Sequence, residues 1–80
     1  MKLPRDLSAQ DLIIALASLG YKVTRQTGSH IRLTTYKNGE HHITIPAHNP
    51  LKIGTLNSLL RDIGNHTGLS RQELVNRLFQ

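Results

Sequence analysis

The chain has 80 residues and no cysteine, which excludes disulfides and any thiolate-bound zinc or iron–sulfur site. Its ten Lys and Arg residues outnumber its five Asp and Glu residues, and the net charge of +5 favours a polyanionic partner such as nucleic acid. The length predicts one domain over residues 1–80. No apolar run approaches the length of a membrane span and no N-terminal segment resembles a signal peptide, so no membrane partner is expected. The absence of cysteine fits a reducing cytosol, and a cytoplasmic location is expected.

The segment LSAQDLIIALASLG, residues 7–20, has the pattern of an amphipathic helix. Ser8 is the expected N-cap, and Asp11 three residues later completes a capping box. Gly20 is suited to the position that follows the last helical residue, because glycine adopts the left-handed conformation required there. The sequence therefore predicts a first helix that ends at this glycine.

Three short strands are predicted next, over residues 21–26, 30–36 and 41–46. A TGS turn connects the first two strands, and the Asn-Gly pair of KNGE, a strong hairpin signal, connects the second and third. Pro46 is expected to end the third strand, because proline has no N–H to donate to a neighbouring strand. These connections predict an antiparallel sheet.

Two further helices are predicted after the strands. GTLNSLLRDIG should form a helix that Thr55 caps and Gly64 ends, and LSRQELVNRLF should form another that begins with Ser70 as N-cap and Glu73 closing a capping box. The predicted order is α-β-β-β-α-α. It indicates an α+β two-layer sandwich, in which a three-stranded antiparallel sheet carries the helices on one face.

Successive side chains of a strand point to opposite faces, which assigns each strand residue to one face. The residues expected to face the helices are Val23, Ile31, Leu33, Ile43 and Ile45. The residues expected on the open, water-facing side are Lys22, Thr24, Gln26, His30, Arg32, Thr34, His42 and Thr44. His30, at the start of its strand, is thus predicted to lie on an open, cationic and hydroxyl-bearing face.

His30 on this face is the main candidate for chemistry. A histidine can accept or donate a proton near neutral pH, and the cations Lys22 and Arg32 beside it would attract phosphate. With a ribose 2′-hydroxyl as nucleophile, and cations to stabilise charge on the phosphoryl oxygens, these groups suffice for RNA cleavage. Gly28 permits positive φ and close backbone approach, and Ser29 either positions the phosphate or satisfies the turn.

Simpler interpretations of these residues stay open. A histidine on a polar sheet face is often only solvated, and the adjacent His41 and His42 point to opposite faces and cannot chelate one ion together. His30, His42 and His48 would have to converge to bind a metal in positive surroundings, so no metal site is predicted. Lys52 marks either an anion site at the start of the second helix or an ordinary helix start. The arginines of the later helices are assigned to solvated faces: Arg61, Arg71 and Arg77.

Three blocks, GSH at 28–30, ITIPAH at 43–48 and KIGTLNSLLRDIG at 52–64, together resemble HicA-type mRNA interferase toxins. The likeness covers about residues 8–78 and implies a double-stranded-RNA-binding-domain-like fold in a bacterial or archaeal cytoplasm. It also implies that His30 is catalytic, and that the activity is metal-independent, cofactor-free endoribonucleolytic cleavage of mRNA that arrests translation. The implied protein partner is a HicB-type antitoxin that covers the site.

We therefore expect the toxin of a type II toxin–antitoxin system, acting on single-stranded or messenger RNA with His30 as general acid or base. The residues expected to bind RNA or phosphate are Lys22, Arg32, Gly28, Ser29 and Lys52. The second proton carrier stays open among His42, His48, Tyr36 and water. One alternative is a non-catalytic RNA-binding module of the same fold, although Lys52 stands almost alone where a duplex-binding module has several lysines. Another is a docking protein whose basic sheet meets an acidic partner.

Overall fold

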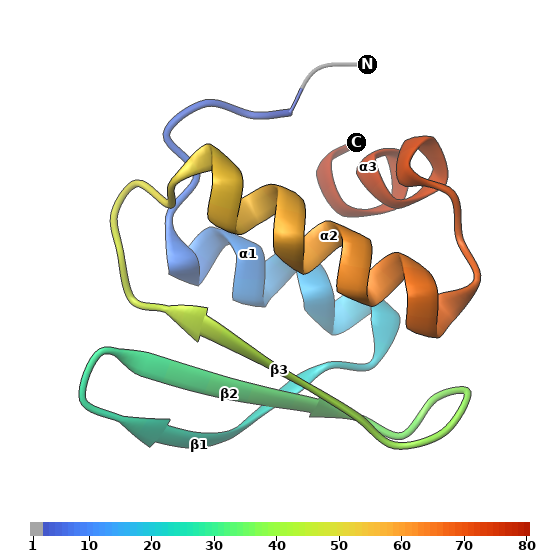
Figure 1. The fold of residues 1–80 in the computed structure, drawn as a ribbon, viewed down its shortest axis with the longest axis horizontal. Coiled ribbons are helices and arrows are strands. Elements are labelled where there is room, and N and C mark those ends of the chain that lie inside the picture. Colours follow the sequence, from blue (N-terminus) through green and yellow to red (C-terminus); the bar gives the residue numbers. More distant parts are fainter. Residues whose placement is uncertain (1–2) are drawn as a thin grey trace.

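The computed structural model describes residues 3–80, and its elements follow the order α-β-β-β-α-α (Figure 1). The helices are α1 (Ala9–Leu16, continued by a 3-10 turn at Ala17–Leu19), α2 (Ile53–Thr67) and α3 (Arg71–Phe79). The strands are β1 (Lys22–Thr27), β2 (His30–Thr35) and β3 (His41–Pro46). The predicted α+β class and element order are confirmed.

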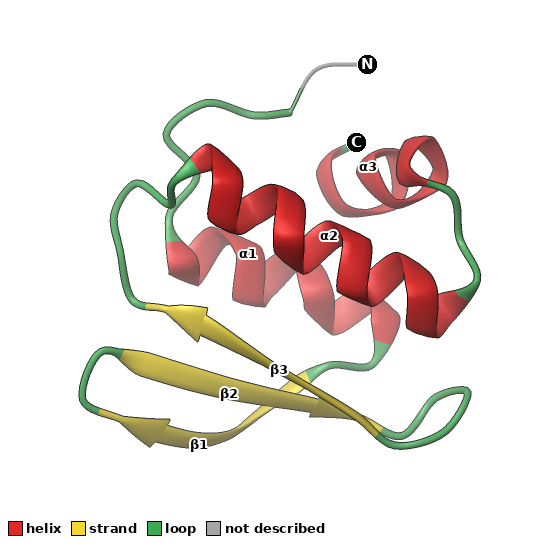
Figure 2. Cartoon of the chain, viewed as in Figure 1, coloured by secondary structure: helices red, strands yellow, loops and turns green. Residues whose placement is uncertain are grey.

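The three strands form one antiparallel sheet in the order β1-β2-β3. All of the helices lie on one side of this sheet, which leaves its other face open (Figure 2). Helix α1 contacts β1, helix α2 contacts β3, and α3 packs against both of these helices. Within residues 3–80, none of the helices combines the length and the apolar character that crossing a bilayer requires.

Capping boxes start two of the helices as predicted. The Ser8 hydroxyl accepts a bond of 3.0 Å from the backbone N–H of Asp11, whose carboxylate accepts one of 3.1 Å from the backbone of Ser8. Ser70 and Glu73 repeat the arrangement at the start of α3, with bonds of 3.1 and 3.0 Å. Hydrogen bonds from the backbone and hydroxyl of Ser70 lower the pKa of the Glu73 carboxyl. Local sequence signals therefore define these helix starts.

The predicted bounds of α2 are wrong at both ends. The helix already starts after Lys52, which is its N-cap, and Thr55 lies within its first turn. It continues through Gly64 and ends at Gly68, which has the left-handed φ of 76°. At Gly64 an added Cβ would lie 3.2 Å from the carbonyl oxygen of Leu69. Gly64 therefore allows close approach of the chain that leads to α3 and does not stop the helix.

The core lies between the sheet and the helices. Four predicted strand residues face the helices and are buried, namely Ile31, Leu33, Ile43 and Ile45. Val23, the fifth residue predicted to be buried, is 47% exposed, so its predicted burial is wrong. Val23 pairs with Leu33 and shares its face, but β1 is an edge strand, so little packs beyond it. Tyr21, directly before β1, is instead 1% exposed and completes the core.

A bulge in β1 changes which side chains share the open face. Lys22 pairs with Thr34 and Val23 with Leu33, but the next residue to pair is Arg25, opposite Arg32. Beyond the bulge the alternation is shifted by one residue, as expected when two residues of one strand oppose one of its neighbour.

Two predictions for the open face are wrong, one in the face that the side chain shares and one in its exposure to water. Gln26 lies opposite Ile31, whose side chain points to the helices, because the bulge has shifted the alternation. Thr34 does lie on the open face but is only 3% exposed, because its hydroxyl is bonded between Thr24 and His42.

Candidate functional site

His30 opens β2 directly after the two-residue turn formed by Gly28 and Ser29. Gly28 has a φ of 56°, the positive value that the first position of a type II′ hairpin turn requires. The adjacent buried residue Ile31 points toward the helices, so the pleat directs His30 to the open face. The His30 side chain is exposed, and its ring makes no hydrogen bond or ion pair with any other residue in the range 3–80.

The end of the sheet at His30 is held by backbone hydrogen bonds. His30 lies between Thr27 of β1 and Pro46 of β3. The backbone N–H of Ala47 donates a bond of 2.6 Å to the carbonyl of Ser29, which continues the strand pairing into the turn. An added Cβ at Gly28 would meet nothing within 4 Å. The turn is thus fixed by its neighbours, and its glycine remains open to the approach of a ligand.

Arg32 lies two residues after His30 on the same face of β2, and the bulge in β1 places Arg25 opposite it. Cross-strand partners of an antiparallel sheet share a face, with Cβ atoms roughly 5 Å apart. Arg25 is not among the predicted site residues. The one sequence feature that pointed to Arg25 was its position in the strand. Unbroken alternation would have directed this charged side chain toward the helices, where a charge is unfavourable.

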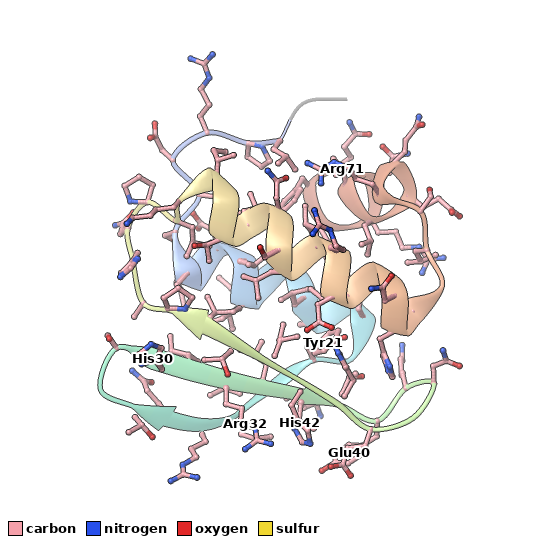
Figure 3. All side chains as sticks on the ribbon, viewed as in Figure 1. Tyr21, His30, Arg32, Glu40, His42 and Arg71 are labelled. Atoms are coloured by element: carbon pink, nitrogen blue, oxygen red, sulfur yellow. The ribbon has the colours of Figure 1, made fainter. Side chains whose placement is uncertain are left out.

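Lys22 and His42 belong to the opposite end of the open face. Both pair with Thr34, four residues from His30 along β2, which is roughly 13 Å of strand. His42 is bound on both ring nitrogens, with Nδ1 2.7 Å from the Thr34 hydroxyl and Nε2 2.7 Å from a Glu40 oxygen. Figure 3 shows His30 at one end of the sheet, His42 and Glu40 toward the other, and Arg32 between them. The structure does not bring His30 and His42 together.

His48 lies at the same end of the sheet as His30. It follows Pro46, the β3 partner of His30, by two residues. Its backbone N–H donates a bond of 2.8 Å to the carbonyl of Pro46, and its own carbonyl accepts one of 3.2 Å from Ala9. Its side chain is exposed. A fixed backbone therefore presents this histidine near the end of the sheet that holds His30.

Adjacent histidines do face opposite sides of the sheet, as predicted. His41 points to the helices, where Nδ1 lies 2.7 Å from the hydroxyl of Tyr21 and Nε2 lies 3.1 Å from Asp62. Its ring also stacks on that of His66, with centroids 4.4 Å apart. Burial, with a smaller effect from the charge of Asp62, raises the pKa of Tyr21 to about 12. This cluster lies away from His30 and joins β3 to α2.

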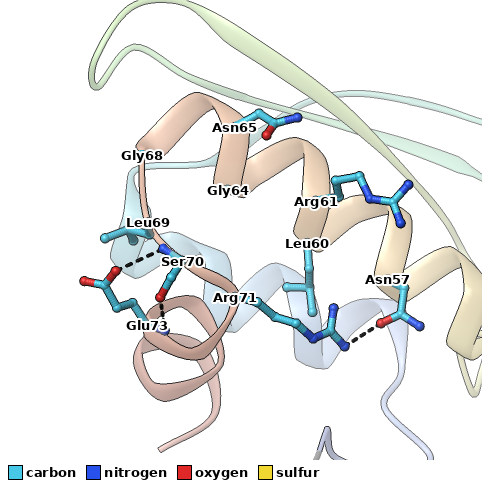
Figure 4. Close-up of a pocket in the computed structure, with 10 residues that line it drawn as sticks. All are labelled: Asn57, Leu60, Arg61, Gly64, Asn65, Gly68, Leu69, Ser70, Arg71 and Glu73. Atoms are coloured by element: carbon cyan, nitrogen blue, oxygen red, sulfur yellow. Dashed lines mark hydrogen bonds between the residues drawn. The ribbon is translucent and has the colours of Figure 1, made fainter.

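A groove separates the outer faces of α2 and α3 (Figure 4). Arg61 and Arg71 line it, and Arg71 donates a bond of 2.6 Å to the side-chain oxygen of Asn57. Arg61, Arg71 and Arg77 are exposed, as predicted. Lys52 is also exposed, at the start of α2 in the helical layer, and makes no side-chain capping bond.

No three His, Asp or Glu side chains within residues 3–80 are grouped so as to hold a metal ion. Among the described residues, the open face holds the imidazole of His30, which has no partner and follows a hydrogen-bonded turn, and the guanidinium groups of Arg25 and Arg32 farther along the strands. An imidazole can transfer a proton, and guanidinium groups bind phosphate through paired N–H donors. The arrangement is suited to acid–base chemistry on a phosphodiester.

Comparison with known protein families matches residues 9–64 to the family described as the HicA toxin of bacterial toxin–antitoxin systems. The matched segment runs from the start of α1 to Gly64 in α2 and includes the whole sheet. A search of curated proteins and a search of solved structures each found no match. The match covers more than half of the chain. The chain therefore belongs to the HicA toxin family of bacterial toxin–antitoxin systems.

Proposed function

We propose that this toxin is a metal-independent endoribonuclease that cleaves mRNA, and so inhibits translation and growth, with His30 as its general acid or base. The observation that carries the proposal is the His30 ring, exposed and without a partner within residues 3–80 on a sheet face that also holds Arg25 and Arg32. A proton carrier beside phosphate-binding cations is what hydroxyl attack on a phosphodiester needs.

In the proposed reaction, the ribose 2′-oxygen attacks the phosphorus and the bond from phosphorus to the 5′-oxygen breaks. One group takes the proton of the 2′-hydroxyl, and another gives a proton to the departing 5′-oxygen. The products are a 2′,3′-cyclic phosphate and a 5′-hydroxyl. DNA has no 2′-hydroxyl, so the same site would leave it intact. His30 performs one of the two transfers, and Arg32 is a phosphate contact that holds the RNA on the open face.

The second proton carrier is proposed to be His48 or a water molecule. His48 is exposed and follows Pro46, which pairs with His30. His42 and Tyr36 are poorly placed. His42 pairs with Thr34, which is four residues from His30 along β2, and Tyr36 follows the last residue of that strand. These positions support His48 or water over His42 and Tyr36.

The remaining RNA contacts are proposed to lie along the open face. Gly28 and Ser29 shape the turn beside the reacting phosphate, and Lys22 is placed to contact RNA that continues toward the far end of the sheet. Lys52, in the helical layer, would contact only RNA that bends around the molecule. A HicB-type antitoxin is the proposed protein partner, and it would act by covering His30.

The proposal is tested by incubating the purified chain, free of partner and with EDTA present, with a single-stranded RNA and with a DNA of the same sequence. We expect new RNA ends that carry a 2′,3′-cyclic phosphate, intact DNA, and no product with His30→Ala. Full cleavage by His30→Ala would remove the assignment of His30, and loss of cleavage with EDTA would indicate a metal-dependent reaction. RNA binding without new ends would make the chain a non-catalytic RNA-binding module.

A further inference from the structure

We propose that Arg25 and Arg32 form a clamp that binds an RNA phosphate next to the one at which cleavage occurs. The β1 bulge positions Arg25 for this clamp. The inference rests on the proposed function, because it names a further contact of the same RNA. It assigns a role to Arg25 and to the bulge, which the sequence analysis left without one.

The register of the sheet places the two arginines directly opposite each other. Pairing passes from Val23 opposite Leu33 to Arg25 opposite Arg32, so Thr24 is the extra residue in β1. Without the bulge, Thr24 would oppose Arg32, and Arg25 would lie opposite Ile31 on the face that packs against the helices. The bulge is therefore what moves a charged side chain to the open face.

A chain of side-chain hydrogen bonds stabilises the bulge from the open face. The Thr24 hydroxyl lies 2.9 Å from the Thr34 hydroxyl, and Thr34 lies 2.7 Å from Nδ1 of His42. Nε2 of His42 lies 2.7 Å from Glu40, and Thr34 at the centre of the chain is buried. Each ring nitrogen and hydroxyl along this route has a partner. These residues act as positioning residues that fix where Arg25 lies.

The two arginines lie opposite each other in the sheet without any compensating charge. Neither Arg25 nor Arg32 forms an ion pair with another residue in the described part of the chain, 3–80. Like charges directly opposite each other across strands destabilise a sheet. A phosphate between the two guanidinium groups would remove this repulsion, and it would accept paired N–H bonds from both. Repulsion in the free protein that an anion relieves indicates a binding site.

The position of the clamp relative to His30 indicates which phosphate it holds. Arg32 is two residues from His30 along β2, roughly 7 Å of strand. A group held there is beside the reacting centre and not at it. Contacts to such a flanking phosphate are equally strong in the ground state and the transition state, so their loss raises KM and leaves kcat nearly unchanged.

The experiment compares the free wild-type chain with Arg25→Gln and with Arg61→Gln, a control that removes the same charge from the exposed face of α2. The binding probe is a single-stranded RNA with 2′-O-methyl groups, which cannot be cleaved by hydroxyl attack, titrated at several salt concentrations. We expect Arg25→Gln to bind about tenfold more weakly at low salt, and its salt slope to fall by about 0.7, as expected when one phosphate contact is lost. Arg61→Gln should keep the wild-type slope.

Two further measurements accompany the titration. With cleavable RNA, Arg25→Gln should raise KM by about the same factor and keep kcat within about twofold. In the absence of RNA, its thermal midpoint at low salt should be about 2 °C above that of wild type, because the repulsion with Arg32 is gone, and the gain should vanish at high salt.

The outcomes separate this inference from the proposed function. If Arg25→Gln binds and cleaves RNA as wild type does, or loses no more affinity than Arg61→Gln, the clamp is wrong while the nuclease assignment stands. A fall in kcat at unchanged KM would place Arg25 at the reacting phosphate and overturn the flanking position. If the wild-type chain binds no RNA at low salt, the proposed function fails, and the clamp fails with it.

Discussion

The hydroxyl of Tyr21 lies 2.7 Å from Nδ1 of His41, beneath the end of the sheet farthest from His30. The two rings meet edge to face, with centroids 5.9 Å apart and planes at 75°. His41 continues to Asp62 through its other nitrogen and so connects the residue before β1 with α2. Every polar atom of this contact has a partner, so Tyr21 can be buried without an unmet hydrogen bond. We interpret the cluster as structural.

The Tyr21 phenol predicts loss of stability in strong alkali. Its pKa is raised to about 12 in the folded chain, mainly by burial, whereas an unfolded tyrosine ionises near 10. The fold therefore favours the neutral phenol. Its contribution is complete below pH of about 10 and is lost as pH rises from there through about 12. In a Tyr36→Phe background, where Tyr21 is the remaining tyrosine, phenolate absorbance should titrate near pH 12. A midpoint near 10 would contradict its burial.

His42→Ala and His30→Ala should have opposite effects. His42→Ala removes the bonds to Thr34 and Glu40 and should lower the free energy of unfolding by about 1 kcal/mol. The variant should keep the wild-type kcat, because His42 pairs with Thr34, which is four residues from His30 along β2. His30→Ala should lose cleavage and keep its thermal midpoint, since an exposed, unbonded ring contributes little to stability. Urea unfolding and RNA cleavage are measured on both. If the His42→Ala variant folded but had no measurable kcat for RNA cleavage, His42 would be the second proton carrier.

Gly20→Ala and Gly28→Ala should differ in cost although both positions have positive φ. At Gly20, with a φ of 84°, an added Cβ would lie 2.9 Å from the hydroxyl oxygen of Thr35, which is buried. At Gly28, with a φ of 56°, nothing lies within 4 Å. We expect about 1 kcal/mol of backbone strain at Gly28, and about 2–3 kcal/mol at Gly20, where the clash adds to the strain. If urea unfolding showed that both variants lose the same free energy of unfolding, the close contact at Gly20 would be refuted.

Local signals account for the parts of the fold that were predicted correctly. Ser8 and Ser70 cap their helices through residues three positions away, and the Asn38-Gly39 pair adopts the two positive φ values of 60° and 97° that its turn requires. None of these features needs a distant part of the chain. The end of α2 does need one, because Gly64 stays helical where the chain before α3 passes close to it.

The site was partly predictable for the same reason. Strict alternation of apolar and polar residues in β2 and β3 placed His30 and Arg32 on the open face. No local pattern marks the extra residue in β1, so the place of Arg25 and the shift of Gln26 went unpredicted. The exposure of Val23 follows from the edge position of β1, which local alternation does not reveal either. The separation of His42 from His30 likewise follows from strand register, which a list of residue types does not contain.

By itself, the order of residues determined the caps that start α1 and α3, the hairpin turns, the buried face of β2 and β3, and the exposure of His30. These depend on contacts within a few positions of chain and on the fixed two-residue period of a strand. Only the tertiary structure decided the length of α2, the burial of Tyr21 and Thr34, and the pairing of Arg25 with Arg32. Those features depend on which distant segment lies opposite, and a single bulge between strands is enough to change the side-chain partners of every residue beyond it.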